Sequence, residues 1–495
     1  MKQNRTTWLL IAGLSFTVSP FVQAQDSDTA EIVRQLQRRI EELEQKVKNL
    51  ETLRTNGVGS GNVSNEKIEA LDQKVKGLER KREIEQEINA ENAKTVPTVS
   101  LGANGLIVRS ADTNFLMNVH GYAQADARFY MNEHNPANDT FLLRRVRPII
   151  EGTVYDRFDY RFMADFGSGN VTGSTPGNNA LLDDAYLNAR IWPDLQVQAG
   201  KFKSPVGLER LQSTAELLFL ETGFATQLTP NYDVGVEVHN NLFNEQINYA
   251  IGVFNGAIDA ASSDVDTTDE GKDIAGRIFF QPFLRTDYEA LNQLGFGFGG
   301  SLGHHEGPLP SYKTPGQQTF FSYASTVSAA GDQHRLDPQF FYYWGPFGLL
   351  GEYIISSQKV KATSAKTTQR FDNSAWQVEA TYFLTGDHNS FRSSSRNSFR
   401  PAHPFSFDNG GWGAFEFVAR IGRLSLDRAA FPVYASSGSA REATSWGVGL
   451  NWYLNSNVRF YFDFESTHFD GGSKAPSALT ARDERALLGR VQFSF

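Results

Sequence analysis

The stretch Phe115–Phe129, FLMNVHGYAQADARF, alternates between apolar or small side chains and polar ones over its whole length. Because successive side chains of a β-strand point to opposite faces of a sheet, this alternation predicts a strand with one apolar and one polar face. The run is longer than most strands of soluble proteins. Such a strand suits a barrel wall that faces lipid on one side and water on the other.

The same alternation returns in Trp376–Leu384, Trp446–Leu454 and Val458–Glu465. The chain then ends at Phe495, and a final strand with a terminal Phe is similar to the assembly signal of bacterial outer-membrane barrels. A soluble β-sandwich would explain the alternation but not the strand length and this ending. Residues 96–495 hold enough chain for about 16 strands at roughly 25 residues per strand and connection. We therefore predict an all-β transmembrane barrel of about 16 antiparallel strands around an aqueous channel.

The composition excludes several other classes of protein. Hydrophobic residues make up 40% of the chain, and no run of 18 apolar residues follows the first two dozen, so a helical membrane protein is not supported. The absence of cysteine excludes disulfides and thiolate catalysis. The net charge of -9 is not the basic composition that is typical of proteins that bind nucleic acid. The nine His show no metal-binding spacing, and we expect no cofactor.

Three segments follow one another along the chain. Residues 1–24 have the charged start, apolar middle and small-residue end of a secretory signal, which predicts export. Residues 25–95 are rich in Glu, Lys, Arg and Gln, and their aliphatic residues follow a heptad spacing. This spacing predicts an α-helical coiled coil, with a hairpin folded back within one chain as the alternative. Residues 96–495 form the predicted barrel domain. The heptad positions are Val33, Leu36, Ile40, Leu43, Val47 and Leu50, then Ile68, Leu71, Val75 and Leu78.

The first candidate site is the arginine-rich strand Phe141–Pro148, FLLRRVRP. Strict alternation places Arg145 and Arg147 on one face and Arg144 on the other. An unpaired charge that faces lipid costs several kcal/mol, about 2–4 at the bilayer midplane. The sequence therefore predicts either a bulge at Arg144 or a position near the membrane interface.

The second candidate site lies in Asp194–Thr214, DLQVQAGKFKSPVGLERLQST. The stretch begins as an alternating strand, and Pro205 and Gly207 then break the pattern. We expect the chain to leave the sheet near Lys201 and Lys203 and to run as an internal loop as far as Tyr232. Arg210 follows within that loop.

Parity along the other predicted strands directs a further set of arginines into the lumen: Arg128, Arg161, Arg190, Arg277, Arg335 and Arg459.

Rows of Arg and Lys along a pore select anions, and the planar guanidinium of Arg matches phosphate oxygens. The alternative is that these arginines pair with lumen carboxylates such as Asp126, Glu151 and Asp165. They would then brace the wall and leave a general-diffusion or sugar-type pore. An enzyme would need a nucleophile or paired carboxylates at one rim, where only His304, His305 and Glu306 cluster, in a predicted loop. A tether built on the coiled coil is compatible with transport.

Polar stretches predict the longer connections between strands. The six predicted surface loops are Gly167–Asn179, Ala260–Gly271, Gly303–Gln318, Gln358–Arg370, Asp387–Gly411 and Asp470–Asp483.

Four motifs resemble the phosphate-selective porin O/P family: LRRVR, GKFKSPVGLER, YDVGVEVHN with YAIGVFNGA, and WGAFEFVARIGRLSLD. The resemblance implies a homotrimeric, 16-stranded porin embedded in outer-membrane lipid, with an inward-folded loop that narrows each pore. Arg144, Arg145 and Arg147 match the family's arginine-rich strand, and Lys201 and Lys203 match its lysines at the start of that loop. We expect a passive anion channel for phosphate or polyphosphate in the outer membrane, and no catalysis.

Overall fold

The computed structural model describes residues 96–131, 138–167, 181–265, 270–364, 367–392, 395–408, 410–472 and 483–495. It also describes residue 45 and short stretches between 69 and 87 (69–70, 72–84 and 86–87), all of which are helical. The predicted signal, residues 1–24, lies outside the described residues, and so does most of the predicted coiled coil. Val75 and Leu78, two of its predicted core positions, are exposed, and pairing of these helices stays a prediction.

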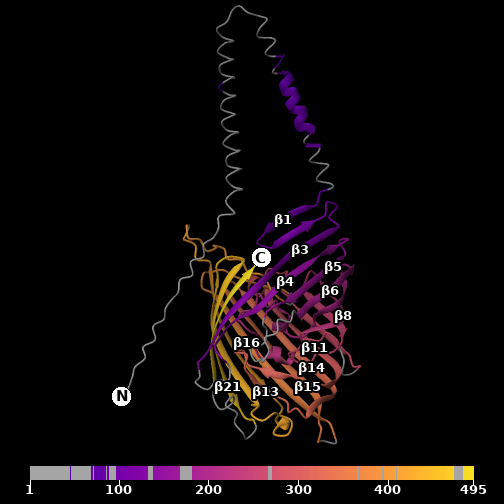
Figure 1. Cartoon of the computed structure of the whole chain (residues 1–495), viewed down its shortest axis with the longest axis vertical. Helices are drawn as coiled ribbons and strands as arrows, with labels where there is room; N and C mark the ends of the chain where they lie inside the picture. Colours follow the sequence, from indigo (N-terminus) through magenta and orange to yellow (C-terminus); the bar gives the residue numbers. More distant parts are fainter. Residues whose placement is uncertain are drawn as a thin grey trace, which may run out of the picture. The chain divides into compact units, whose positions relative to one another are not determined.

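The described part of residues 96–495 contains a closed antiparallel barrel of 16 strands, as the sequence predicts. Each strand pairs with its neighbours in chain order, and β22 closes the barrel by pairing with β3 (Figure 1). The strands are β3 (Phe115–Tyr130), β4 (Thr140–Val154), β5 (Phe158–Asp165), β6 (Leu181–Trp192), β7 (Leu195–Lys203), β8 (Tyr232–Leu242), β9 (Ile247–Phe254), β10 (Asp273–Phe280), β11 (Gln293–Gly307), β14 (Val327–Trp344), β15 (Phe347–Ala362), β16 (Gln369–Phe383), β19 (Ala414–Ser425), β20 (Glu442–Tyr453), β21 (Val458–Asp470) and β22 (Glu484–Ser494).

A short hairpin extends the wall at the seam of the barrel. Its strands are β1 (Thr98–Gly102) and β2 (Gly105–Arg109), and β2 pairs with the beginning of β3. The terminal Phe495 exchanges two backbone hydrogen bonds with Gly121 of β3, at 3.0 and 3.1 Å. The end of the chain is therefore fixed against the strand that begins the barrel.

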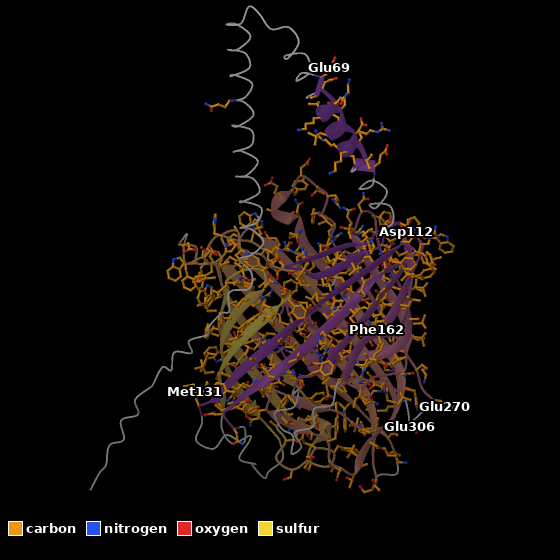
Figure 2. All side chains as sticks on the ribbon, turned by 45° about the horizontal axis from the view of Figure 1, so that its top comes forward. Glu69, Asp112, Met131, Phe162, Glu270 and Glu306 are labelled. Atoms are coloured by element: carbon orange, nitrogen blue, oxygen red, sulfur yellow. The ribbon has the colours of Figure 1, made fainter. Side chains whose placement is uncertain are left out.

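The alternation seen in the sequence places apolar side chains outside and polar ones inside. On β3, Phe115 and Phe129 are exposed, whereas Gln124 and Asp126 are buried. On β21, Phe462 faces outward and Arg459 lies inside. Large apolar side chains project from the outer surface, where Phe162 is 51% exposed (Figure 2). None of the helices among the described residues is long and apolar enough to span a bilayer.

Three of the predicted surface loops need correction. Gly303–Gly307 belongs to β11, and the rest of Gly303–Gln318 enters a hairpin of β12 (Ser311–Lys313) and β13 (Thr319–Ser322) that folds inward. Strands β15 and β16 extend into Gln358–Arg370, as far as Ala362 and from Gln369, respectively. In Asp387–Gly411, Phe391 and Phe399 are buried, so this connection covers apolar groups. Pairing with neighbouring strands and apolar burial override the local polarity of these stretches.

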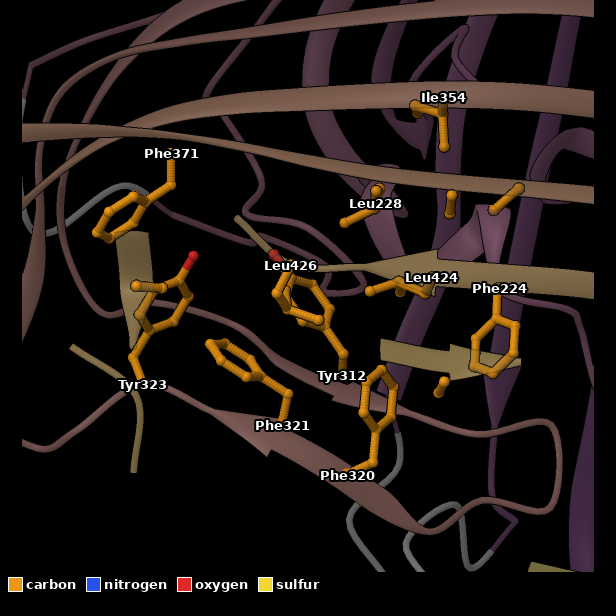
Figure 3. Close-up of a cluster of buried hydrophobic side chains, with 14 of the residues drawn as sticks. Phe224, Leu228, Tyr312, Phe320, Phe321, Tyr323, Ile354, Phe371, Leu424 and Leu426 are labelled. Carbon is orange, nitrogen blue, oxygen red and sulfur yellow. The ribbon is translucent and has the colours of Figure 1, made fainter. Parts of the chain in front are cut away.

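Part of the interior is packed as a hydrophobic core. A cluster of aromatic and aliphatic side chains joins the β7–β8 loop (residues 204–231), the β11–β14 loop (residues 308–326) and the β19–β20 loop (residues 426–441) to the inner wall (Figure 3). Phe224 packs edge-to-face on Phe320, with 6.0 Å between ring centroids. Apolar burial of this kind stabilises inward-folded loops. These loops therefore fill part of the lumen on the side of the barrel from which they fold inward.

Candidate functional site

The β7–β8 loop is held inside the barrel by charged side chains of the opposite wall. Asp337 accepts a hydrogen bond from the backbone N–H of Gly207 at 2.8 Å, and Glu352 accepts one from Leu208 at 2.7 Å. Buried backbone groups need such partners, because an unpaired polar group inside a protein is costly.

Arginines of the barrel wall donate hydrogen bonds to backbone carbonyl groups of the same loop. Arg459 donates to the carbonyl oxygen of Ala215 at 2.8 Å, and Arg490 donates to that of Leu220 at 2.7 Å. Arg459 also forms an ion pair with Glu216 at 2.9 Å. Arg459 was predicted to face the lumen; it does, but as a support for the loop.

The predicted bulge at Arg144 is present. Gln124 of β3 pairs with Arg145 of β4, and the next residue, Ala125, pairs with Leu143, so Arg144 has no partner across the strands. The extra residue turns the Arg144 side chain away from lipid and into the barrel. Its Nε donates to Glu221 Oε1 at 2.5 Å, and its Nη2 donates to Glu221 Oε2 at 3.1 Å.

Glu221, on the β7–β8 loop, gathers four arginines. Besides Arg144, its carboxylate lies 2.7 Å from Arg128, 3.4 Å from Arg145 and 3.6 Å from Arg490. Burial alone would raise the pKa of Glu221, but Arg144, Arg145 and Arg128 outweigh it and hold the pKa well below its ordinary value. Asp126 shares Arg128 and Arg490. In this group, called the Glu221 cluster below, four guanidinium groups share two carboxylates.

A polar cavity of about 350 Å³ lies between the β7–β8 loop and the wall on the side of β4 to β8. Arg147 and Arg161 line it, and each is paired with two carboxylates. Arg147 lies 2.8 Å from Asp165 and 2.7 Å from Asp183. The remaining pairs join Arg161 to Glu151 and Asp184. Both arginines are where parity placed them, and they are also neutralised locally.

Lys203 lines the same cavity. Its Nζ donates to the carbonyl oxygen of Gln212 at 2.6 Å and lies 5.6 Å from the centre of the Tyr232 ring. No ion pair joins it to a carboxylate of the described residues. It therefore contributes positive charge to a cavity whose arginines are already matched.

The chain leaves the sheet at the two lysines, as the sequence predicts. Strand β7 ends at Lys203, since β6 pairs with it as far as Lys201 and β8 as far as Lys203. Lys201 is buried and its Nζ pairs with Asp264 of the β9–β10 loop. The ion pair of Lys201 thus holds the β9–β10 loop against β7.

Arg210 and Arg190 also bind neighbouring groups. Arg210 sits on α3 (Leu208–Leu211), within the β7–β8 loop, and donates to Thr229 Oγ1 at 3.0 Å and to the carbonyl oxygen of Thr226. Arg190, near the end of β6, pairs with Asp159 and is partly exposed. Arg210 therefore stabilises the folded conformation of the β7–β8 loop. Arg190 joins the end of β6 to the beginning of β5.

The remaining parity predictions lie inside the barrel. Arg335 is buried between Asp259 at 2.7 Å and Asp273 at 3.0 Å, and Arg277 donates to Gln339 at 2.9 Å. The trio around His304 lies on β11 and not in a loop, which corrects the sequence-based expectation. His304 is exposed, whereas His305 is buried against Asp273 at 2.9 Å, so the adjacent imidazoles do point to opposite faces.

Sequence analysis missed several members of the site. Arg490 and Arg420 could have been found by parity, since each alternates with outward apolar residues on its strand. Glu221 and Lys313 lie in loops that have no periodicity. No local signal places them in the lumen.

The family model for phosphate-selective porin O and P matches residues 117–495. The chain belongs to this family. It is therefore an outer-membrane porin, a channel that conducts anions passively. Solved porin structures are similar in fold at low identity. The outer-membrane channel DcaP of Acinetobacter baumannii is 11% identical, with a TM-score of 0.49, over 78% of this chain and 99% of that one.

Two further structures show a similar level of likeness. The anion-selective porin from Comamonas acidovorans is 12% identical, with a TM-score of 0.46, over 77% of this porin and all of that chain. The trimer form of OmpT from Vibrio cholerae is 11% identical, with a TM-score of 0.45, over 77% and 99% of the two chains. No curated protein matches this porin in sequence.

Proposed function

We propose that this porin takes up phosphate and related oxyanions along the side of the lumen formed by β3 to β8. The observation that carries the proposal is the Glu221 cluster, in which four arginines share two carboxylates. Such an excess of fixed positive charge attracts anions and repels cations. Arg144 and Arg145, from the arginine-rich strand β4, supply part of it.

The cavity beside Lys203 is a second place on the same side where a cation lines the lumen. Its two arginines are paired with four carboxylates, whereas the ammonium of Lys203 has no carboxylate partner among the described residues. A weak site next to a stronger one suits conduction, because an ion must bind well enough to enter and loosely enough to leave. An anion on this route would bind at two places in turn, the Glu221 cluster and the cavity beside Lys203.

A general-diffusion or sugar-type porin is the second candidate function. It is favoured by the pairs that Arg147 and Arg161 make, which cancel charge where the sequence suggested free arginines. Under this alternative the arginines brace the wall, and selectivity among small solutes follows from pore width alone. The excess charge at Glu221 is the feature that this alternative leaves unexplained.

Reversal potential in a salt gradient separates the two functions. The full-length porin is inserted in a planar bilayer, and phosphate is added stepwise to a chloride bath. We expect a reversal on the anion side and a chloride current that low phosphate blocks. A weak or cation-sided reversal without block would mean that the paired arginines leave a general pore.

We also propose that the porin assembles as a homotrimer, as its family resemblance implies. Light scattering of the purified protein, corrected for detergent, measures the mass of the assembly directly. A mass of three chains is expected, and a stable monomer would contradict the proposal.

A further inference from the structure

The cavity beside Lys203 contains polar side chains that have no partners in the part of the chain that the structure describes. Glu237, on β8, lines this cavity and is only 8% exposed, yet its carboxylate makes no hydrogen bond or ion pair with a described residue. The side-chain amide of Gln198, on β7, also lines the cavity and has no hydrogen-bond partner among the described residues. A buried carboxylate without a partner is costly, so Glu237 indicates a ligand with a positively charged or hydrogen-donating group.

The register of the barrel wall places Glu237 and Gln198 side by side. The two residues are partners across β7 and β8, and both line the cavity. Directly opposed residues of antiparallel strands have Cβ atoms about 4.5–5.5 Å apart, so the carboxylate and the amide can contact one small group together. The next inward residue of β8, His239, is engaged elsewhere, because its Nε2 lies 3.0 Å from Oδ1 of Asn188 on β6.

The charge of the cavity favours a cationic group beside Glu237. The charged side chains that line it are Arg147, Arg161, Lys203, Asp184 and Glu237. The two arginines pair with four carboxylates, of which Asp184 is one. Three cations are therefore set against five carboxylates when Glu237 is included. Fixed charges of one sign repel one another strongly in a poorly solvated place, and a bound ammonium group would relieve this repulsion.

The far end of the same cavity is formed by Lys203 and Tyr232. These two residues are also partners across β7 and β8, five positions along β7 from Gln198 (198 to 203). Between the two ends, Tyr186 and Phe202 line the cavity and pack edge-to-face, with 6.0 Å between ring centroids. Aromatic faces pack against aliphatic chains and attract ammonium groups. The cavity therefore suits an elongated ligand that has an apolar middle and a charged group at each end.

We propose that Glu237 and Gln198 bind the ammonium group of a small, elongated zwitterion whose anionic end lies toward Lys203. The chemical class is an ω-amino acid or a similar solute with opposite charges at its two ends. The Glu237 carboxylate and the amide oxygen of Gln198 accept hydrogen bonds from the ammonium group. Such a ligand would give one partner each to the carboxylate and the ammonium that form no ion pair among the described residues. This inference goes beyond the proposed function, because the group that is recognised is a cation and not an oxyanion.

The test uses two probes that differ in one group. 6-Aminohexanoate and hexanoate share their chain length and their carboxylate, but only 6-aminohexanoate carries an ammonium group. Each probe is added to the full-length porin in a planar bilayer in potassium chloride, and the concentration that halves the ion current is measured. We expect Glu237→Gln to raise this concentration about tenfold for 6-aminohexanoate, the effect of losing one charged hydrogen bond. For hexanoate the same substitution should leave it unchanged or lower it, because the charge that is removed repels a carboxylate.

Two further variants control for charge and for position. Glu237→Asp keeps the carboxylate and should retain part of the block by 6-aminohexanoate. Glu289→Gln makes the same substitution at an exposed position between β10 and β11 and should change neither concentration. Heat-modified electrophoretic mobility shows whether each variant is folded. We expect Glu237→Gln to fold, because glutamine has the same size and the carboxylate that it replaces has no partner among the described residues.

Each result decides for or against the site. A wild-type porin that 6-aminohexanoate does not block would overturn the proposal. Equal shifts for the two probes in Glu237→Gln would mean that the substitution changes the lumen in general, which would also overturn it. The same holds if Glu289→Gln shifts the response to 6-aminohexanoate as much as Glu237→Gln does. The proposed function is tested separately, by reversal potential and phosphate block of the wild-type porin, and neither measurement uses a probe with an ammonium group.

Discussion

Nε of Arg144 donates to Oε1 of Glu221 at 2.5 Å, which joins a bulge in the barrel wall to a loop folded into the lumen. The wall residue would face lipid if β4 alternated strictly, and the loop residue would be a buried, isolated carboxylate. Each side chain therefore removes a cost that the other would bear alone. The same contact holds Glu221 among the four arginines of the proposed anion route.

Glu221→Gln should make the porin more selective for anions and less stable. The substitution leaves four guanidinium groups with Asp126 as their only ion-pair partner among the described residues. Breaking a buried pair costs about 3–5 kcal/mol. We expect a lower phosphate concentration at half-block in bilayers and an earlier urea midpoint for unfolding. Glu289→Gln, at an exposed position between β10 and β11, is the control and should change neither quantity. A variant as stable as wild type would contradict the role assigned to Glu221.

The contribution of Glu221 to stability should depend on pH in a defined direction. Its pKa is well below the unfolded value of about 4.3, so its contribution is fully present above that value and is lost as pH falls through the folded pKa. The difference in unfolding free energy between wild type and Glu221→Gln should therefore shrink as pH falls below about 4. Urea unfolding at several pH values measures it, and a difference that grows in acid would contradict the argument.

Arg459→Met should loosen the β7–β8 loop. Arg459 pairs with Glu216 at 2.9 Å and donates to Ala215, so its removal leaves a buried carboxylate and carbonyl without their donor. We expect a loss of stability of about 3–5 kcal/mol and a larger, noisier single-channel conductance. Arg423→Met is the matched control, because Arg423 pairs with Glu442 at an exposed position and should cost at most about 1 kcal/mol. Unchanged current noise in Arg459→Met would mean that the loop does not depend on this arginine.

The wall of the barrel could be predicted from sequence because its residues repeat with a period of two. That period placed Arg128 and Arg459 inside. The cost of a charge in lipid predicted either a bulge at Arg144 or a position near the membrane interface, and the structure has the bulge. Asp126, Glu151 and Asp165 were named as possible partners of the lumen arginines, as the alternative to free arginines. In the structure they pair with Arg128, Arg161 and Arg147, respectively. Whether such residues pair depends on distances across strands, which the sequence pattern does not contain.

The loops could not be predicted in the same way. Glu221 and Lys313 lie in segments without a period, and their inward position depends on apolar contacts such as Phe224 with Phe320. The end of β7 near Lys203 is an exception, because Pro205 and Gly207 mark the break in the sequence. Pairing with β8 supplies the hydrogen bonds that continue the strand to Lys203.

Gly200→Ala should impair barrel assembly. Gly200 has a φ of 130°, and a Cβ there would lie 2.2 Å from the carbonyl oxygen of Ala185 on β6. The strained backbone alone costs about 1–3 kcal/mol, and the contact with β6 adds to it. We expect less folded porin in outer-membrane fractions, measured by heat-modified mobility. Gly102→Ala is the control, since its Cβ would meet nothing within 4 Å, and equal yields for both variants would contradict the prediction.

Lys203→Glu should weaken or reverse the preference for anions. Lys203 brings positive charge to a cavity in which Arg147 and Arg161 are already paired with four carboxylates, so a glutamate there would add to the excess of negative charge. The neutral Lys203→Gln should have an intermediate effect, because it removes a charge without adding the opposite one. Reversal potentials in a chloride gradient should therefore shift in the order wild type, Gln, Glu. Lys361→Glu makes the same charge change on the outer surface of the wall and should leave the reversal potential near the wild-type value. If the two Glu variants shift equally, the selectivity reflects the overall charge of the protein and Lys203 is not part of the anion route.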